Sequence, residues 1–191
     1  MNRTIQGMRD GRIAAAFLCL LVIGARAAQA QISSNPVGVT LNATVDDSIA
    51  VTVSASNVGF NLIPGTGPTA GTPTVTVTTS WNLHPGGTPT LSLYGFFSSS
   101  AAALTSGAPG GDIPSANVLA GINGGAPAAF TQTGPLGAAG ASLQIFFIPI
   151  SGVNKNSSRN DTLDLFINLT SQPGLPTGTY TGVLSLQAQA L

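Results

Sequence analysis

The chain contains short runs in which apolar residues alternate with small polar ones. The first run places five apolar residues on one parity, separated by glycine, threonine and asparagine: Val37, Val39, Leu41, Ala43 and Val45. A period of two predicts a strand with one buried face. Asp46 and Asp47 interrupt this pattern, which resumes from Ile49 to Ala55, so that both runs could form one long, bent strand.

Similar runs follow at short spacing along the chain. The run from Val75 to Leu83 includes Trp81, its largest candidate core residue, and a turn at 85–87 leads to Leu91 and Leu93. The short connection predicts a hairpin. Later runs lie at 143–148, 163–169 and 180–188, and the first of these is apolar on both parities, which predicts a strand covered on both faces.

The segment between these groups, 98–141, is rich in alanine, glycine, serine and proline and predicts short strands within a packed, irregular excursion. Roughly seven or eight strand signals without an amphipathic helix predict an all-β fold. We expect an antiparallel, immunoglobulin-like β-sandwich, with a closed barrel as the alternative.

Residues 1–30 have the features of a secretory signal peptide. Three arginines precede an apolar run at 13–24, and Ala28-Gln29-Ala30 is a suitable cleavage site. The apolar run is shorter than the roughly 20 residues of a membrane-spanning helix, and no later segment is long and apolar enough. We therefore expect residues 31–191 to form one exported domain, in the periplasm, at the cell surface or outside the cell. The only cysteine, Cys19, would leave with the leader.

The charged residues exclude several classes of partner. Residues 31–191 contain two cations, Lys155 and Arg159, against five aspartates and no glutamate, a net charge of −3. A protein that neutralises phosphates needs a cluster of cations. We therefore expect neither nucleic acid nor an anionic membrane as a partner.

The residues needed for catalysis or metal binding are also missing. His84 is the only imidazole, and no Gly-x-Ser-x-Gly sequence surrounds any serine. Adjacent Asp46 and Asp47 point to opposite faces of an extended strand, and Asp161 and Asp164 also differ in parity. The sequence predicts no catalytic residues, no metal site and no cofactor, and hence no enzyme.

Two stretches of the chain carry a family resemblance. The first comprises the run at 37–45, the run at 49–54 and Val58-Gly59-Phe60, and the second, at 175–186, reads P-x-G-x-Y-x-G-x-L-x-L. Together they resemble the spore coat protein U family and the related archaic chaperone-usher pilins. The family pattern places cysteines near Ile49 and Ser80, and this sequence has neither. The tyrosine motif also occurs in unrelated sandwiches, where the hydroxyl ties a loop to the strand.

The resemblance implies a pilin-like subunit that lacks its own final strand and accepts the N-terminal segment of a neighbour by β-strand addition. Residues 31–45 would be the donor strand, and the groove would lie beside the closing strand with Tyr180, Leu184 and Leu186. The implied partners are other subunits in a head-to-tail polymer, a periplasmic chaperone and an usher. Alternatively, residues 37–45 pair within their own domain and complete a self-contained secreted or cell-surface sandwich with a binding or adhesive role.

Overall fold

The computed structural model describes residues 37–84, 86, 90–107 and 111–191. The predicted signal peptide and the first six residues of the predicted donor strand lie outside these ranges. The chain divides after Ala43 into two units, and the sandwich is formed by the second, Thr44–Leu191.

The described part of this second unit contains nine strands and one short 3-10 helix. They are β1 (Ser48–Val53), β2 (Thr69–Ala70), β3 (Val75–Asn82), β4 (Thr90–Phe96), η1 (Ser115–Asn117), β5 (Val118–Ile122), β6 (Ala128–Ala129), β7 (Ser142–Pro149), β8 (Asn156–Ile167) and β9 (Ser185–Ala190).

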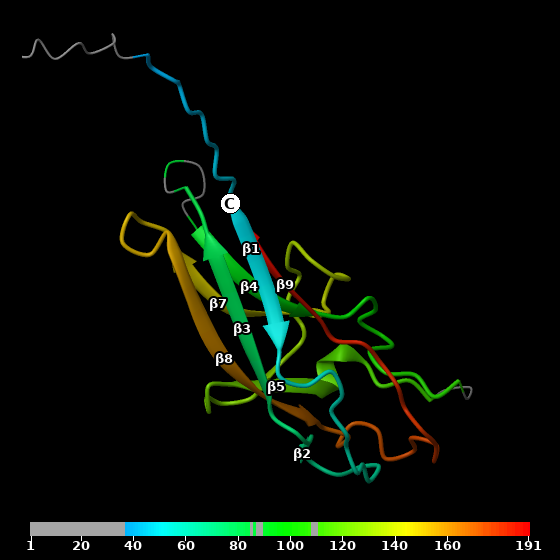
Figure 1. The fold of residues 1–191 in the computed structure, drawn as a ribbon. Helices are drawn as coiled ribbons and strands as arrows, with labels where there is room; N and C mark the ends of the chain where they lie inside the picture. The colour runs from blue at the N-terminus through cyan, green and yellow to red at the C-terminus, as the bar shows by residue number, and fades with distance from the viewer. Residues whose placement is uncertain (1–36, 85, 87–89, 108–110) are drawn as a thin grey trace, which may run out of the picture. The chain divides into compact units, whose positions relative to one another are not determined.

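The strands form two antiparallel sheets that pack face to face (Figure 1). The large sheet has the order β1-β3-β8-β5-β6, with β2 also paired to β8, and the small sheet has the order β7-β4-β9. The predicted all-β antiparallel sandwich is confirmed, and two separate sheets replace the alternative of a closed barrel. The immunoglobulin-like topology stays a prediction.

The prediction of a hairpin between the runs at 75–83 and 91–93 is wrong. β3 pairs with β1 and β8 in the large sheet, whereas β4 pairs with β7 and β9 in the small sheet. Both strands bury one face in the interior, so the connection crosses from one sheet to the other. A short connection keeps two successive strands close in space, but it does not determine whether they form backbone hydrogen bonds with each other or with other strands.

β7 is an edge strand and is not covered on both faces as the sequence predicted. Phe147 is 57% exposed, whereas Ile145 and Phe146 are both buried. The register against β4 shifts between Leu93 and Tyr94, because Leu93 lies opposite Phe146 and Tyr94 lies opposite Gln144. This bulge turns two consecutive residues toward the core, which explains why both parities of the segment are apolar.

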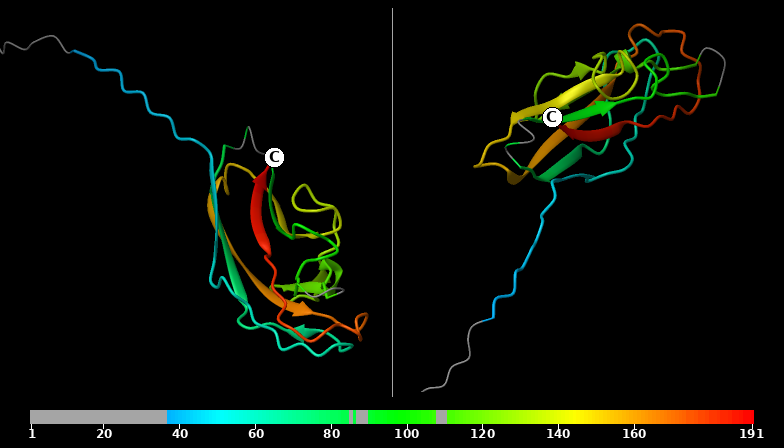
Figure 2. Two further views of the ribbon diagram at one scale, coloured as in Figure 1. Left: turned by 90° about the vertical axis from the view of Figure 1, so that its right-hand side faces the viewer. Right: turned by 90° about the horizontal axis from the view of Figure 1, so that it is seen from above.

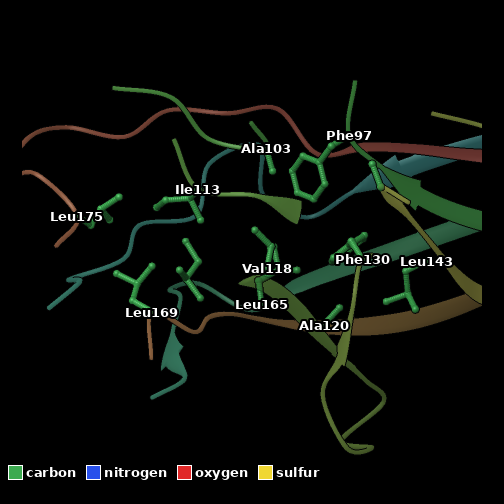
Figure 3. Close-up of a cluster of buried hydrophobic side chains, with 12 residues drawn as sticks. Phe97, Ala103, Ile113, Val118, Ala120, Phe130, Leu143, Leu165, Leu169 and Leu175 are labelled. Atoms are coloured by element: carbon green, nitrogen blue, oxygen red, sulfur yellow. The ribbon is translucent and has the colours of Figure 1, made fainter. Parts of the chain in front are cut away.

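The core consists of two clusters of buried side chains. One contains Trp81 with Leu91 and Leu93, which confirms Trp81 as a large core residue. The other includes Phe97 and Phe130 in an edge-to-face pair, with 5.2 Å between ring centroids. Figure 3 shows this second cluster, where side chains from 98–141 meet those of β8. The glycine-rich segment is therefore a packed excursion, as the sequence predicted.

Candidate functional site: an apolar groove

The second core cluster is open on one side of the sandwich, where a groove of about 1010 Å³ lies between two stretches of chain. One wall is residues 53–64, which follow β1, and the other is residues 175–186, which lead into β9. Figure 2 shows these two stretches, in cyan and red, on one side of the molecule.

The floor of the groove is the hydrophobic core itself. It is lined by Phe97, which follows β4, and by four residues from β5, β8 and the turn after β8: Val118, Leu165, Ile167 and Leu169. Phe97, Ile167 and Leu169 are nearly inaccessible to solvent, so that the apolar surface of the groove comes mainly from the half-buried side chains around them. The groove therefore presents apolar surface to whatever enters it.

The first wall presents three half-buried apolar side chains, those of Val58, Phe60 and Leu62. Gly59 and Thr72 exchange two backbone hydrogen bonds, of 2.8 and 3.0 Å, which hold this wall against the chain before β3. Glycine is required at position 71, next to this wall, because a Cβ there would lie only 2.5 Å from Val58 Cγ1.

The second wall is fixed by a tyrosine. The Tyr180 hydroxyl donates a hydrogen bond of 2.6 Å to the carbonyl oxygen of Pro176 and so ties the loop to the closing segment. Thr181 and Thr105 exchange backbone hydrogen bonds of 2.9 and 2.8 Å. The wall is therefore held by bonds to Pro176 and to Thr105.

The backbones of the two walls are not joined. Among the described residues, no backbone hydrogen bond connects 54–64 with 176–184. β1 pairs only with β3, and β9 pairs only with β4, so that each sheet ends at this side with a free border. An extended peptide in the groove would find apolar side chains below it and backbone polar groups beside it.

The structure places the predicted closing-strand residues together. Tyr180, Leu184 and Leu186 all line the groove. Only Leu186 belongs to the last strand, which begins at Ser185 and not at Tyr180 as predicted. The backbone bonds of Thr181 go to Thr105 and not to β4, so the residues before Ser185 leave the small sheet.

The predicted half-buried strand at 37–45 is wrong for the chain as described. Residues 37–47 form no strand, and Leu41 is 89% and Val45 82% exposed; Val37 and Val39 are also exposed, as is Ala43. A strand needs a backbone partner, and none of the described residues supplies one. Whether this segment acts as a donor strand stays a prediction.

Sequence reasoning missed most of the groove. Val58, Phe60 and Leu62 share one parity in the sequence, but nothing in it showed that these side chains form a wall. The floor residues come from distant segments, and only packing brings them together.

Tyr180 is the one titratable residue among those that line the groove, and the other lining residues are apolar or small and polar. In the described part of the chain, no three residues among His, Cys, Asp and Glu are grouped to hold a metal ion. A shallower depression over β1, β3 and β8 is lined mainly by serine and asparagine and also carries no charged group.

Comparison of the chain with protein-family models, with curated proteins and with solved structures found no match. Within the described residues, no helix combines the length and the apolar character of a membrane span.

Proposed function

We propose that the protein is an exported structural subunit, similar to a pilin, that assembles head to tail by β-strand addition. The observation that carries the proposal is the groove, which is lined by apolar side chains between residues 53–64 and 175–186, two walls that no backbone hydrogen bond joins among the described residues. An open border above an apolar floor favours aggregation unless another chain covers it. A strand from another polypeptide would form hydrogen bonds with the unpaired backbone groups and cover the apolar side chains.

Residues 37–45 have the composition that such a strand needs. Their apolar residues all have one parity, so that one face of the strand would enter the groove and the other would carry threonine and asparagine. Complete burial of one valine or leucine side chain is worth about 1.5–3 kcal/mol. Burial of several such side chains, with a ladder of backbone hydrogen bonds, would offset the roughly 4–15 kcal/mol that association costs in lost freedom.

The proposal implies further partners. Export and a role at the cell surface agree with the features of residues 1–30, and the resemblance to archaic chaperone-usher pilins implies a periplasmic chaperone and an usher. The chaperone would cover the groove until a subunit's strand replaces it. No cofactor and no catalytic residue enter this proposal.

Two adjacent substitutions in the exported full-length chain test strand addition. Leu41→Asp puts a charge on the face that enters the groove, whereas Asn42→Asp puts the same charge on the outward face. A carboxylate without a partner in an apolar site costs several kcal/mol, so Leu41→Asp should abolish detergent-resistant multimers. Asn42→Asp should retain them. Equal behaviour of the two variants would favour the self-contained sandwich.

A further inference from the structure

We propose that Asn123 is a latent deamidation site: the folded sandwich suppresses the reaction, and conversion of the amide would loosen the contact between β5 and β8. This inference does not depend on the proposed function. Three observations carry it, namely the residue that follows Asn123, the conformation of the turn, and the hydrogen-bond partners of the amide group.

Asn123 is followed by Gly124, and this is the only Asn-Gly dipeptide in the sequence. Deamidation begins when the backbone nitrogen of the next residue loses its proton to base and attacks the side-chain Cγ. The N–Cγ bond forms, the Cγ–Nδ2 bond breaks and ammonia leaves, and water then opens the five-membered imide to aspartate or isoaspartate. Glycine has no side chain to hinder this attack. Both residues are exposed, so that water and base reach them.

The two residues form the centre of a tight turn that follows β5. Asn123 has a φ of 51° and Gly124 a φ of 74°. The Gly125 N–H donates a hydrogen bond of 2.8 Å to the carbonyl oxygen of Ile122 and closes the turn. Two positive φ values are typical of a type I′ turn, in which the Asn123 Cβ and the Gly124 nitrogen lie on nearly opposite sides of the Cα–C bond. The imide ring needs them on the same side, so that the turn must first open.

The amide group of Asn123 is also held at both ends by β8. Nδ2 donates a hydrogen bond of 2.7 Å to Asp161 Oδ1, while the Asn123 Oδ1 accepts bonds of 2.8 Å from the backbone N–H and 3.3 Å from the hydroxyl of Thr162. The Asn123 N–H donates to the carbonyl oxygen of Thr162 at 2.9 Å. Ring closure draws Cγ to the Gly124 nitrogen and takes both amide atoms away from β8. The reaction therefore needs molecules in which these bonds are broken.

Conversion would replace the hydrogen bond between Asn123 and Asp161 by two carboxylates. Asp161 is inaccessible to solvent and is already bonded to Arg159. A carboxylate at position 123 has no proton to donate to Asp161, so that like charges would lie within hydrogen-bond distance. The end of β5 would separate from β8, together with Ile122, which packs against both core clusters. Because ammonia is lost, the change would be one-way.

Peptide mapping of the exported protein tests the site. One sample is kept folded and one unfolded in urea, both in mildly alkaline buffer, and both are then digested with chymotrypsin. Cleavage after Leu119 and Phe130 releases residues 120–130, in which Asn123 is the only asparagine. We expect aspartate and isoaspartate to accumulate at position 123 at least about tenfold more slowly in the folded sample.

A variant separates protection by the fold from the intrinsic chemistry of the dipeptide. Arg159→Met weakens the network around Asp161 but leaves the Asn-Gly dipeptide unchanged. When folded, this variant should convert faster than wild type, and in urea the two proteins should convert at the same rate. Equal rates for folded and unfolded wild type would overturn the inference, as would the absence of conversion in urea.

Asn123→Asp tests the consequence, because aspartate is one of the two products. This variant should have a lower melting temperature than wild type, since it places a carboxylate beside Asp161. Asn42→Asp is the matched control, because it adds the same charge in the exposed segment before β1 and should leave the melting temperature unchanged. A melting temperature of Asn123→Asp equal to that of the control would contradict the loosening of β5 from β8.

Discussion

Arg159 and Asp161 form a two-point ion pair on one face of β8, with the arginine Nε 2.8 Å from Oδ2 and Nη2 2.7 Å from Oδ1. Asp161 is inaccessible to solvent, and Asn123 Nδ2 donates a third hydrogen bond of 2.7 Å to Oδ1. The guanidinium also stacks over the ring of Phe146 on β7, at 4.8 Å from its centroid. The pair therefore satisfies a buried carboxylate and joins the two sheets.

Removal of the arginine should destabilise the sandwich. Arg159→Met keeps much of the side-chain volume but leaves Asp161 buried with Asn123 as its remaining partner, which should lower the free energy of unfolding by about 3 kcal/mol. Urea denaturation measures this loss. The double variant Arg159→Met/Asp161→Leu should recover part of it, because no buried charge remains. Equal stability of wild type and Arg159→Met would contradict the assigned role.

The same pair predicts a loss of stability in acid. Burial by itself raises the pKa of Asp161, but the hydrogen bonds from Arg159 and Asn123, with the charge of Arg159, hold the pKa below its ordinary value of 3.8. At a pH between the pKa of Asp161 in the folded chain and its ordinary pKa in the unfolded chain, the unfolded chain binds more protons than the folded chain. The stabilisation is therefore fully present above about pH 4 and is lost as the pH falls through the folded-state pKa.

Urea denaturation at several values between about pH 6 and pH 2 tests this dependence. Wild type should lose more stability over this range than Arg159→Met, which lacks the main cause of the lowered pKa. The other aspartates are present in both proteins, so that their titration cancels in the comparison. Parallel curves for the two proteins would refute the prediction.

Adjacent residues on the second wall should differ in their effect on assembly. Both Leu184 and Val183 border the groove, but the Leu184 side chain is half-buried and packs against the core cluster, whereas Val183 is 76% exposed. Leu184→Asp places a charge where an apolar strand binds and should abolish detergent-resistant multimers, while Val183→Asp should leave them intact. Because Leu184 is only half-buried, both variants should fold and give similar circular dichroism spectra. Loss of multimers in both variants, or in neither, would argue against this wall as a binding surface.

The first wall depends on the absence of a side chain at Gly71. In Gly71→Ala the new Cβ would meet Val58 and Phe60, so that the wall must move, at a cost of about 1–3 kcal/mol. Thermal unfolding should show a lower melting temperature, and assembly should weaken. Gly67→Ala is the matched control, because a Cβ at Gly67 meets no atom within 4 Å. A melting temperature unchanged in Gly71→Ala would show that the wall is not closely packed.

The sequence by itself determined the fold class and much of the core. Alternation set the inward faces of β3 and β8 and indicated Trp81 as a core residue, because side chains in a strand point to opposite faces whatever its neighbours are. The hydrogen bond from Tyr180 to Pro176 is also local, because both residues lie within one short segment, but the sequence did not predict it.

Only the tertiary structure decided which strands pair and where the core stays open. β3 and β4 are close in sequence yet belong to different sheets, and the groove joins side chains from β5, β8 and both walls. The physical reason is that alternation specifies which face of a strand is buried but not which backbone lies beside it. The open side of the sandwich depends on those lateral partners, and they are fixed only when the whole unit packs.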